Sequence, residues 1–407
     1  MSDETSTSAL PATGGGAEPE AAGEHGPAGE HGPAGEHGPA GEPGPVGEHG
    51  PQTVSRSRRA PGINPSGETP YLEVQDLVVS FPTSDGVVHA VQGLTYSLAL
   101  GRTLAIVGES GSGKSVSSMA VMGLHDPRST RIAGSIKLGG TEIVGRSQEE
   151  LRRLRGNAVA MIFQDPQSSL HPFFTIGDQI IEAYQAHHQV SKRKARERAA
   201  DLLGRVGIPN PRRRLDDYPH QFSGGMRQRA MIAMALVNDP KLLIADEPTT
   251  ALDVTVQAQI LDLILDLQQD FGSAVVFITH DLGVVAETAD DILVMYAGRC
   301  VEYGSVQNIL GSPVHPYTWG LLESIPAVSG EPARLHPIPG LPPSLLALPT
   351  GCSFHPRCEF PGRVPYGMCK EDLPDLIPRT LDPNRLSRCH LSDPARIFET
   401  EILTRLP

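Results

Sequence analysis

The stretch Thr103-Leu-Ala-Ile-Val107-Gly108-Glu-Ser-Gly-Ser-Gly-Lys114-Ser115 decides the fold of this chain. A short apolar run ends in a loop that fits the pattern G-x-x-x-x-G-K-[ST]. Glycines let backbone N–H groups turn inward around phosphate oxygens, and a helix that begins near Ser115 points the positive end of its dipole at the same place. We therefore expect this loop to cradle phosphates through Gly108, Ser110, Gly111 and Gly113. Lys114 would reach the β- and γ-phosphates, and the Ser115 hydroxyl would bind Mg²⁺.

A second apolar run, 242–246, ends in two acidic residues, Asp246 and Glu247. Such a strand places both acids at the carboxyl edge of the sheet, where open α/β sheets bind ligands. We expect Asp246 to hold Mg²⁺ through water and Glu247 to polarise the attacking water.

A third feature is Ser223-Gly224-Gly225, which opens a long helix predicted over 226–237. A serine followed by two glycines at a helix N-terminus forms another anion-binding end. A single subunit does not need two anion-binding helix N-termini, one after the phosphate loop and one after Ser223, to bind one nucleotide. We therefore expect a second subunit to supply this end across an interface.

Further short apolar runs predict strands at 158–163, 274–279 and 291–296, and the run at 72–81 alternates as a strand does. Apart from 72–81, these runs are short and do not alternate, which indicates a sheet buried on both faces. The last of them is joined to a strand predicted at 299–303 as a hairpin. Helices predicted between the strands, including 191–207 and 254–269, indicate an α/β domain with a mainly parallel sheet.

Composition limits the classes of function. The chain has 407 residues and a net charge of −13, of which −9 falls on residues 1–52. The near-neutral remainder shows no basic footprint of a nucleic-acid binder. The longest apolar run, 230–237, has eight residues, whereas a membrane span needs about 20. With no signal peptide visible, we expect an intracellular chain without a membrane span.

Residues 1–68 are predicted to be a disordered acidic tail. Within it, 23–52 is a ten-triplet repeat with glycine at every third position and four histidines. The pattern is collagen-like, but a triple helix of ten triplets would be weak. A solvated tail with polyproline II bias is the preferred interpretation, and a stable metal site at the histidines is not expected.

From about Tyr71 onward the chain resembles the ATP-binding subunits of ABC transporters. The resemblance rests on the phosphate loop, Gln164 in FQDPQSSLHP, the signature FSGGMRQR (222–229), the acid pair, the D-loop Ala251-Leu252-Asp253, and His280 at the end of a strand. Phe81 lies where the family places an aromatic residue that stacks on adenine. The signature departs from the family's LSGGQ form at Phe222 and Met226.

The resemblance implies an ABC ATPase fold over 69–312. This fold has a RecA-like core, an antiparallel β subdomain and a helical subdomain at about 166–238. It also implies that two such domains sandwich two ATP molecules, each covered at its γ-phosphate by the Ser223, Gly224 and Gly225 of the other domain. Gln164 would sense Mg²⁺ and the attacking water, and His280 would bridge the γ-phosphate to Glu247 and the partner. Asp253 belongs to the implied nucleotide-binding set, and 164–174 is the implied docking groove for a membrane subunit.

Residues 313–407 are Pro-rich and irregular. The stretches His315-Pro-Tyr-Thr318 and GCSFHPRC (351–358) resemble the C-terminal extension of oligopeptide/dipeptide importers. Four thiols in this segment could ligate Zn²⁺ or an Fe–S cluster, or be buried free thiols. They belong to Cys352, Cys358, Cys369 and Cys389. The resemblance favours a structural [4Fe–4S] cluster over zinc, and Cys300 is predicted to be a small core residue.

Taken together, the resemblance implies the ATP-hydrolysing subunit of a di- or oligopeptide importer, peripheral to the cytoplasmic face of the membrane. Its implied partners are two membrane permease subunits, a second and non-identical ATPase subunit and an extracytoplasmic substrate-binding protein, with no nucleic acid. One alternative is an importer ATPase for another solute such as nickel. Another is a regulatory or binding module, based on the tail or the cysteines, with an idle ATPase.

Overall fold

The computed structural model describes residues 68–250, 252–325 and 336–406. The described residues belong to one compact unit, Arg56–Pro407. Nearly all of the predicted tail, including the Gly/Pro/His repeat, lies outside the described residues.

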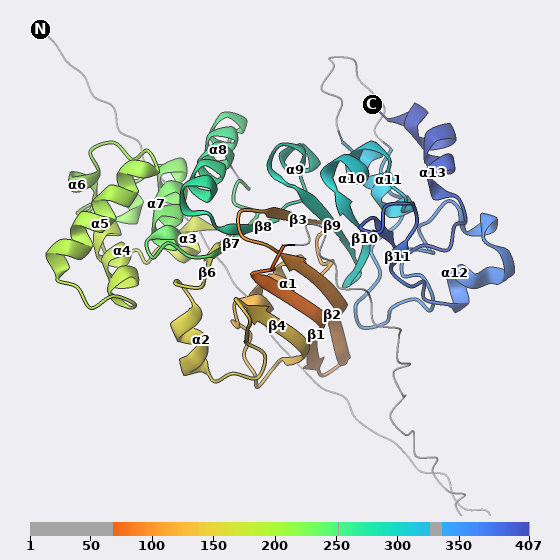
Figure 1. Cartoon of the computed structure of the whole chain (residues 1–407), viewed down its shortest axis with the longest axis horizontal. Coiled ribbons are helices and arrows are strands. Elements are labelled where there is room, and N and C mark those ends of the chain that lie inside the picture. The colour runs from red at the N-terminus through yellow and green to blue at the C-terminus, as the bar shows by residue number, and fades with distance from the viewer. Residues whose placement is uncertain (1–67, 251, 326–335, 407) are drawn as a thin grey trace, which may run out of the picture. The chain divides into compact units, whose positions relative to one another are not determined.

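The central sheet has eight strands in the order β11-β12-β10-β9-β3-β8-β7-β6 (Figure 1). Strands β9, β3, β8, β7 and β6 run parallel, and β10, β12 and β11 continue the sheet antiparallel. Every residue of β3, β7 and β8 is buried, as the lack of alternation predicted. The mainly parallel α/β sheet is therefore confirmed. The strands are β3 (Thr103–Val107), β6 (Val159–Ile162), β7 (Leu242–Asp246), β8 (Ala274–Ile278), β9 (Asp291–Tyr296), β10 (Arg299–Ser305), β11 (Ile377–Pro378) and β12 (Leu386–Ser387).

A second, antiparallel sheet has the order β2-β1-β4-β5. Its strands are β1 (Leu72–Thr83), β2 (Gly86–Leu98), β4 (Arg131–Leu138) and β5 (Thr141–Glu142). Its inward side chains, such as Leu77 and Tyr96, share one apolar cluster with Leu104 and Leu293 of the central sheet. This shared core fixes the antiparallel sheet beside the phosphate loop that follows β3.

The longer helices begin where their sequences provide caps. Ser191, Ser223 and Asp253 each accept a backbone N–H from the first turn of the following helix, and Gly272 ends α8 in a left-handed conformation. Such caps satisfy N–H groups that have no partner inside the helix. The helices before residue 312 are α1 (Lys114–Val121), α2 (Gln148–Leu154), α3 (Pro166–Ser169), α4 (Ile176–Gln185), α5 (Lys192–Arg205), α6 (Pro211–Arg214), α7 (Gly224–Leu236), α8 (Val254–Phe271), α9 (Leu282–Thr288) and α10 (Val306–Gly311).

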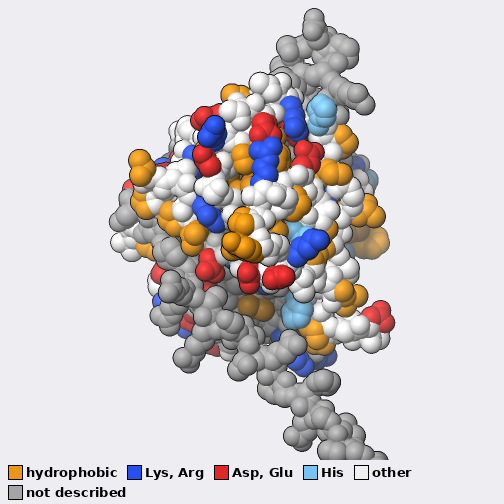
Figure 2. All heavy atoms as spheres, turned by 90° about the vertical axis from the view of Figure 1, so that its right-hand side faces the viewer, with side chains coloured by type: hydrophobic (Ala, Val, Ile, Leu, Met, Phe, Trp, Pro, Cys, Tyr) orange, Lys and Arg blue, Asp and Glu red, His pale blue; other side chains and the backbone are white. Residues whose placement is uncertain are grey.

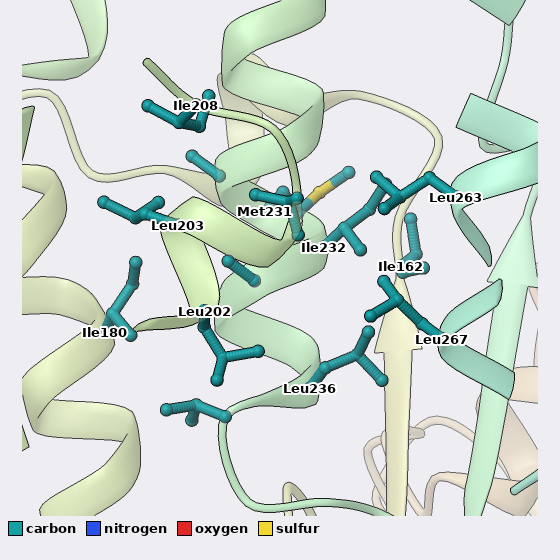
Figure 3. Packing of buried hydrophobic residues seen from close by; sticks show 14 of the residues in the cluster. Ile162, Ile180, Leu202, Leu203, Ile208, Met231, Ile232, Leu236, Leu263 and Leu267 are labelled. Carbon is teal, nitrogen blue, oxygen red and sulfur yellow. The ribbon is translucent and has the colours of Figure 1, made fainter. Parts of the chain in front are cut away.

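Helices α4, α5 and α7 pack with α8 and the edge of the central sheet around one apolar core (Figure 3). Figure 3 shows side chains from these helices turned into this core, among them Leu203 of α5, Met231 and Leu236 of α7 and Leu267 of α8. This packing holds the N-terminus of α7, where Ser223 lies, at a fixed place relative to the sheet.

The C-terminal region is mostly irregular, with the helices α11 (Pro316–Glu323), α12 (Met368–Glu371) and α13 (Pro394–Ile397) and several single 3₁₀ or π turns. Its large side chains Trp319, Phe354 and Phe398 enter a third apolar cluster that also contains Val107 and Val294 of the central sheet. Acidic and basic side chains are interspersed on the face over this region (Figure 2). In the part of the chain that the structure describes, no helix combines the length and apolar character needed to cross a membrane.

Candidate nucleotide-binding site

The phosphate loop leaves β3 and enters α1, and two of its glycines are required by close backbone contacts. A Cβ on Gly108 would lie 2.2 Å from the Met295 carbonyl oxygen, and one on Gly113 would lie 2.3 Å from that of Ala90. Both glycines have positive φ angles, 150° and 101°, which residues with side chains rarely adopt. The loop is therefore clamped between β9 and β2 in a shape that only glycine permits.

Lys114 is buried at the start of α1, and its ammonium is held by the loop itself. Nζ donates to the Gly108 carbonyl oxygen at 2.7 Å and to that of Glu109 at 3.1 Å. Burial lowers the pKa of Lys114, while the carboxylates of Glu247, Asp246 and Glu109 act in the opposite direction. The ammonium is thus preorganised at the loop, where phosphate oxygens of a nucleotide could replace its carbonyl partners.

Ser115 and Asp246 meet across the junction of α1 and β7. The Ser115 hydroxyl donates to Asp246 Oδ1 at 3.1 Å. Burial raises the pKa of Asp246, and the neighbouring Glu247 raises it further, against the effect of the Ser115 hydrogen bond. A hydroxyl beside a desolvated carboxylate is a hard-oxygen donor set, which fits Mg²⁺.

Glu247 follows β7 with a positive φ of 46°, an unusual conformation for a residue with a side chain. Its backbone N–H donates to the Ile278 carbonyl oxygen at 2.9 Å, which ties the turn to the end of β8. Such strain persists only where surrounding structure fixes it, and it is frequent at functional sites.

Three side chains contact the Glu247 carboxylate. Gln164 Nε2 and the Thr250 hydroxyl each donate to Oε2 at 3.0 Å, and His280 Nδ1 lies 3.4 Å from Oε1. Gln164 and His280 were expected here, whereas the sequence reasoning missed Thr250. The TT pair after Glu247-Pro248 was its only signal.

Gln164, Glu247 and His280 line one cavity of about 570 Å³ together with the phosphate loop. Eight of the residues named from the sequence motifs line it, and Asp246 joins them through its hydrogen bond with Ser115. The eight are Ser110, Gly111, Gly113, Lys114, Ser115, Gln164, Glu247 and His280. A curled glycine loop, a buried ammonium and a carboxylate with three polar neighbours can bind a polyphosphate and direct a water molecule at it.

Other residues named from the sequence lie outside this cavity. Phe81 packs edge-on against His125, with ring centroids 5.6 Å apart. Ser223 and Gly224 are exposed, and the Ser223 hydroxyl accepts the Met226 N–H at 3.3 Å. Asp253 and Gly225 belong to neighbouring helix ends, where Asp253 caps α8 and Gly225 lies against Val256 of that helix. Gly108, at the start of the loop, is likewise not among the lining residues. Their roles in nucleotide binding stay predictions.

The four C-terminal cysteines gather around the third apolar cluster. The Cys352 N–H donates to the Cys369 carbonyl oxygen at 2.9 Å, and the thiols are close enough to influence one another's charge. However, among the described residues no group of three or more His, Cys, Asp or Glu side chains is arranged to hold a metal ion. As placed, the thiols do not fit a metal or cluster, so the predicted [4Fe–4S] cluster and its zinc alternative receive no support from this arrangement. Cys300 lies apart from them, buried in β10.

The fold and this cavity define the class of protein, an ATP-binding cassette. A dimeric ATP-binding cassette solved in a post-hydrolysis state with ADP and Pi matches 58% of this chain and 98% of its own, with 25% identity and a TM-score of 0.53. The structure of cbiO1 from Clostridium perfringens, part of an ABC transporter complex, matches 60% and 92%, with 28% identity and a TM-score of 0.51. The ABC transporter family profile matches residues 91–250.

A second profile, the oligopeptide/dipeptide transporter C-terminal region, matches residues 301–363. The oligopeptide transport ATP-binding protein OppD of Salmonella typhimurium is 50% identical over 318 residues, or 78% of this chain and 92% of the relative. OppD of Bacillus subtilis is 52% identical over 301 residues, covering 73% and 84%. The chain belongs to the oligopeptide transport ATP-binding protein family of ABC transporters.

Proposed function

We propose that this chain is the ATP-hydrolysing subunit that powers import of di- or oligopeptides across the cytoplasmic membrane. The observation that carries the proposal is the single cavity into which the phosphate loop, Gln164, Glu247 and His280 converge. The family membership supports peptides as the solute class rather than another solute such as nickel. The complete set of polar groups in the cavity argues against an idle ATPase.

The phosphate loop and Lys114 hold the triphosphate in this proposal. Lys114 exchanges its carbonyl partners for phosphate oxygens, while Ser110, Gly111 and Gly113 present backbone groups to the same oxygens. Ser115, Gln164 and Asp246 would hold Mg²⁺, which when bound neutralises charge on the phosphate oxygens.

Glu247 orients and polarises the water that attacks the γ-phosphate. Gln164 and Thr250 fix one oxygen of its carboxylate, which leaves the other facing His280. His280 adds a donor at the place where charge develops on the γ-phosphate. Phosphoryl transfer of this kind depends on positioning and charge neutralisation more than on covalent chemistry.

The variant Glu247→Gln tests this assignment. It keeps the size of the side chain and removes its charge, so we expect ATP binding to remain and turnover to fall by several orders of magnitude. Binding is measured with a fluorescent ATP analogue and turnover by phosphate release. Glu149→Gln, in an exposed ion pair with Arg153, serves as the control. Turnover equal to that of the control would remove Glu247 from the mechanism.

The proposed working unit contains a second ATPase subunit, non-identical to this one, whose serine–glycine helix end covers the γ-phosphate bound here. Ser223 and Gly224 are exposed and do not line the nucleotide cavity of this chain, which leaves them accessible to a second subunit and supports this arrangement. Phe81 would stack on adenine, and Asp253 would lie among the nucleotide contacts.

The proposed membrane partners are two permease subunits, with a substrate-binding protein on the far side of the membrane. The chain would sit peripherally on the cytoplasmic face. Two aromatic side chains in the 164–174 stretch support a docking surface there, since Phe173 is 82% exposed and Phe174 is 54% exposed. Exposed aromatic side chains beside each other are typical of binding surfaces.

We also propose the three-part organisation 1–68, 69–312 and 313–407, with an iron–sulfur cluster in the third part. The cluster is proposed from the sequence resemblance alone, because Cys352, Cys358, Cys369 and Cys389 lie around one apolar cluster but their thiols would have to shift to hold a metal. A cluster would close the loops of an irregular segment. An anaerobically purified sample should be brown and contain iron, and a colourless, iron-free sample would contradict the cluster.

A further inference from the structure

The C-terminal region touches the phosphate loop at Glu109, the residue after the first loop glycine. Arg357 donates to both carboxylate oxygens of Glu109, with Nη1 2.6 Å from Oε2 and Nη2 3.0 Å from Oε1. The Tyr317 hydroxyl accepts the Glu109 backbone N–H at 2.8 Å. These partners lie 248 and 208 residues along the chain, in the GCSFHPRC stretch and in α11.

The hydrogen bond from Tyr317 acts on the lysine of the loop through one peptide unit. The N–H of the 108–109 peptide faces the Tyr317 hydroxyl, while the carbonyl oxygen of the same peptide accepts Lys114 Nζ at 2.7 Å. A peptide unit is planar, so fixing its N–H also fixes its carbonyl. A hydroxyl in α11 thereby sets the direction of an acceptor that positions Lys114.

Arg357 is itself held rigidly. Its side chain is 5% exposed, and Nε donates to the Pro339 carbonyl oxygen at 2.8 Å. Its guanidinium also lies 5.8 Å from the ring centroid of Tyr296, a residue of β9. A planar guanidinium that is itself held by several contacts fixes the carboxylate it binds in one orientation.

The charge of Glu109 makes this pairing relevant to nucleotide binding. Its carboxylate stands on a loop shaped for phosphates, and like charges repel over several ångströms where water is scarce. Arg357 compensates that charge and holds the carboxylate on the side of the loop that faces the C-terminal region. Without Arg357, the carboxylate would be free to turn toward the bound polyphosphate.

We propose that Arg357 and Tyr317 are positioning residues that hold the phosphate loop ready for nucleotide. ATP binding then depends on the folded C-terminal region. This inference rests on the proposed ATP site, and it adds two residues outside the cavity on which ATP binding depends.

The test measures binding of a fluorescent ATP analogue to the full-length chain and variants. Arg357→Gln should weaken binding about tenfold, because it leaves the Glu109 charge unpaired. Glu109→Gln alone should have less effect, since it removes the repelling charge. The double variant should therefore bind better than Arg357→Gln alone. Tyr317→Phe, which deletes only the hydroxyl, should weaken binding several-fold.

Arg363→Gln is the matched control. Arg363 forms the same kind of bidentate ion pair with Glu401, with both hydrogen bonds at 2.7 Å, but this pair is exposed on the surface of the C-terminal region. This variant should bind the analogue as the wild type does. If Arg357→Gln also binds as the wild type does, or if Glu109→Gln fails to restore binding to the Arg357 variant, the proposal is overturned.

Two further measurements separate the possible failures. Lys114→Ala should abolish binding, and if it does not, the ATP site itself is wrong rather than its coupling to Arg357. Hydrogen exchange of the peptide covering 351–358 should slow when a non-hydrolysable ATP analogue binds, since coupling between two sites is reciprocal. Tyr317→Phe and Glu109→Gln leave Arg357 in place. If Arg357→Gln does not fold, the binding measurement can therefore still be made on these two variants. Exchange unaffected by the nucleotide in the wild type would contradict the coupling.

Discussion

At the scale of single residues, His315 is a buried side chain whose hydrogen bonds require a neutral imidazole ring. Its Nδ1 accepts the Tyr317 N–H at 3.1 Å, and its Nε2 lies 3.1 Å from the Arg388 carbonyl oxygen, to which it donates. A second proton on Nδ1 would face another donor. Burial lowers the pKa of His315 from 6.5 to about 3, because the charged ring would lose its hydration.

This lowered pKa predicts loss of stability in acid. The folded pKa is below the unfolded one, so the contribution of His315 is complete above pH 6.5 and is lost as the pH falls toward 3. At pH 5 the loss should be about 2 kcal/mol. The variant His315→Asn keeps an acceptor for the Tyr317 N–H and cannot titrate, so its unfolding free energy should fall less between pH 7 and pH 5 than that of the wild type.

Denaturant unfolding at each pH measures the effect, with the exposed His89 replaced by Asn as the control. The control should follow the wild type across the range. Parallel pH profiles for His315→Asn and the wild type would show that His315 does not titrate as its burial indicates.

The residues that the sequence could predict are those in local patterns. Lys114 and Glu247 stand at fixed places in short motifs, and the ends of adjacent parallel strands bring such motifs together. Thr250 and Arg357 could not be assigned in this way. Their contacts depend on a strained turn after β7 and on the path of an irregular segment, neither of which leaves a periodic pattern in the sequence.

At the scale of elements, α5 and α7 offer a matched pair of helix caps. Ser191 accepts the Lys194 N–H at 3.4 Å, and Ser223 accepts the Met226 N–H at 3.3 Å. The helices have 14 and 13 residues and share one apolar core. The two serines therefore have equivalent local roles, but only Ser223 is proposed to contact a partner's nucleotide.

Replacing each serine with alanine separates these roles. Both variants should lose about 1 kcal/mol of unfolding free energy, because each removes one capping hydrogen bond. Only Ser223→Ala should also lower ATP turnover in the assembled transporter. Thermal unfolding and phosphate release are measured on both. Equal turnover in the two variants would mean that Ser223 is a cap and nothing more.

Element boundaries show what a sequence pattern resolves. The runs at 103–107, 242–246 and 291–296 match β3, β7 and β9, since apolar residues begin and end with the buried strand. The helix predicted from Met226 begins at Gly224 instead, because the cap at Ser223 starts the first turn at the glycines. The two-residue strands β11 and β12 gave no signal, since they pair only through the fold of the C-terminal region.

At the scale of the whole molecule, strands from the ATP-binding cassette and from the C-terminal region belong to the same central sheet. Strand β10 pairs with both β9 and β12, so the central sheet continues into residues beyond 312. Trp319 is buried in the third cluster, and its Nε1 donates to the Pro313 carbonyl oxygen at 2.9 Å. The core residues that the structure describes all lie at Leu72 or later in the chain.

Two truncations should therefore behave in opposite ways. Deleting residues 1–60 removes none of these core residues, so the thermal midpoint, ATP binding and transport should stay as in the wild type. Stopping the chain after Ser312 uncovers the apolar face of β9 and β10 and removes a sheet neighbour, so the product should aggregate or unfold at a much lower temperature. Circular dichroism melts and size-exclusion chromatography distinguish these outcomes. A soluble 1–312 fragment that binds ATP would mean that the C-terminal region is dispensable to the fold and to the phosphate loop. Loss of transport on deleting 1–60 would give the tail a function of its own.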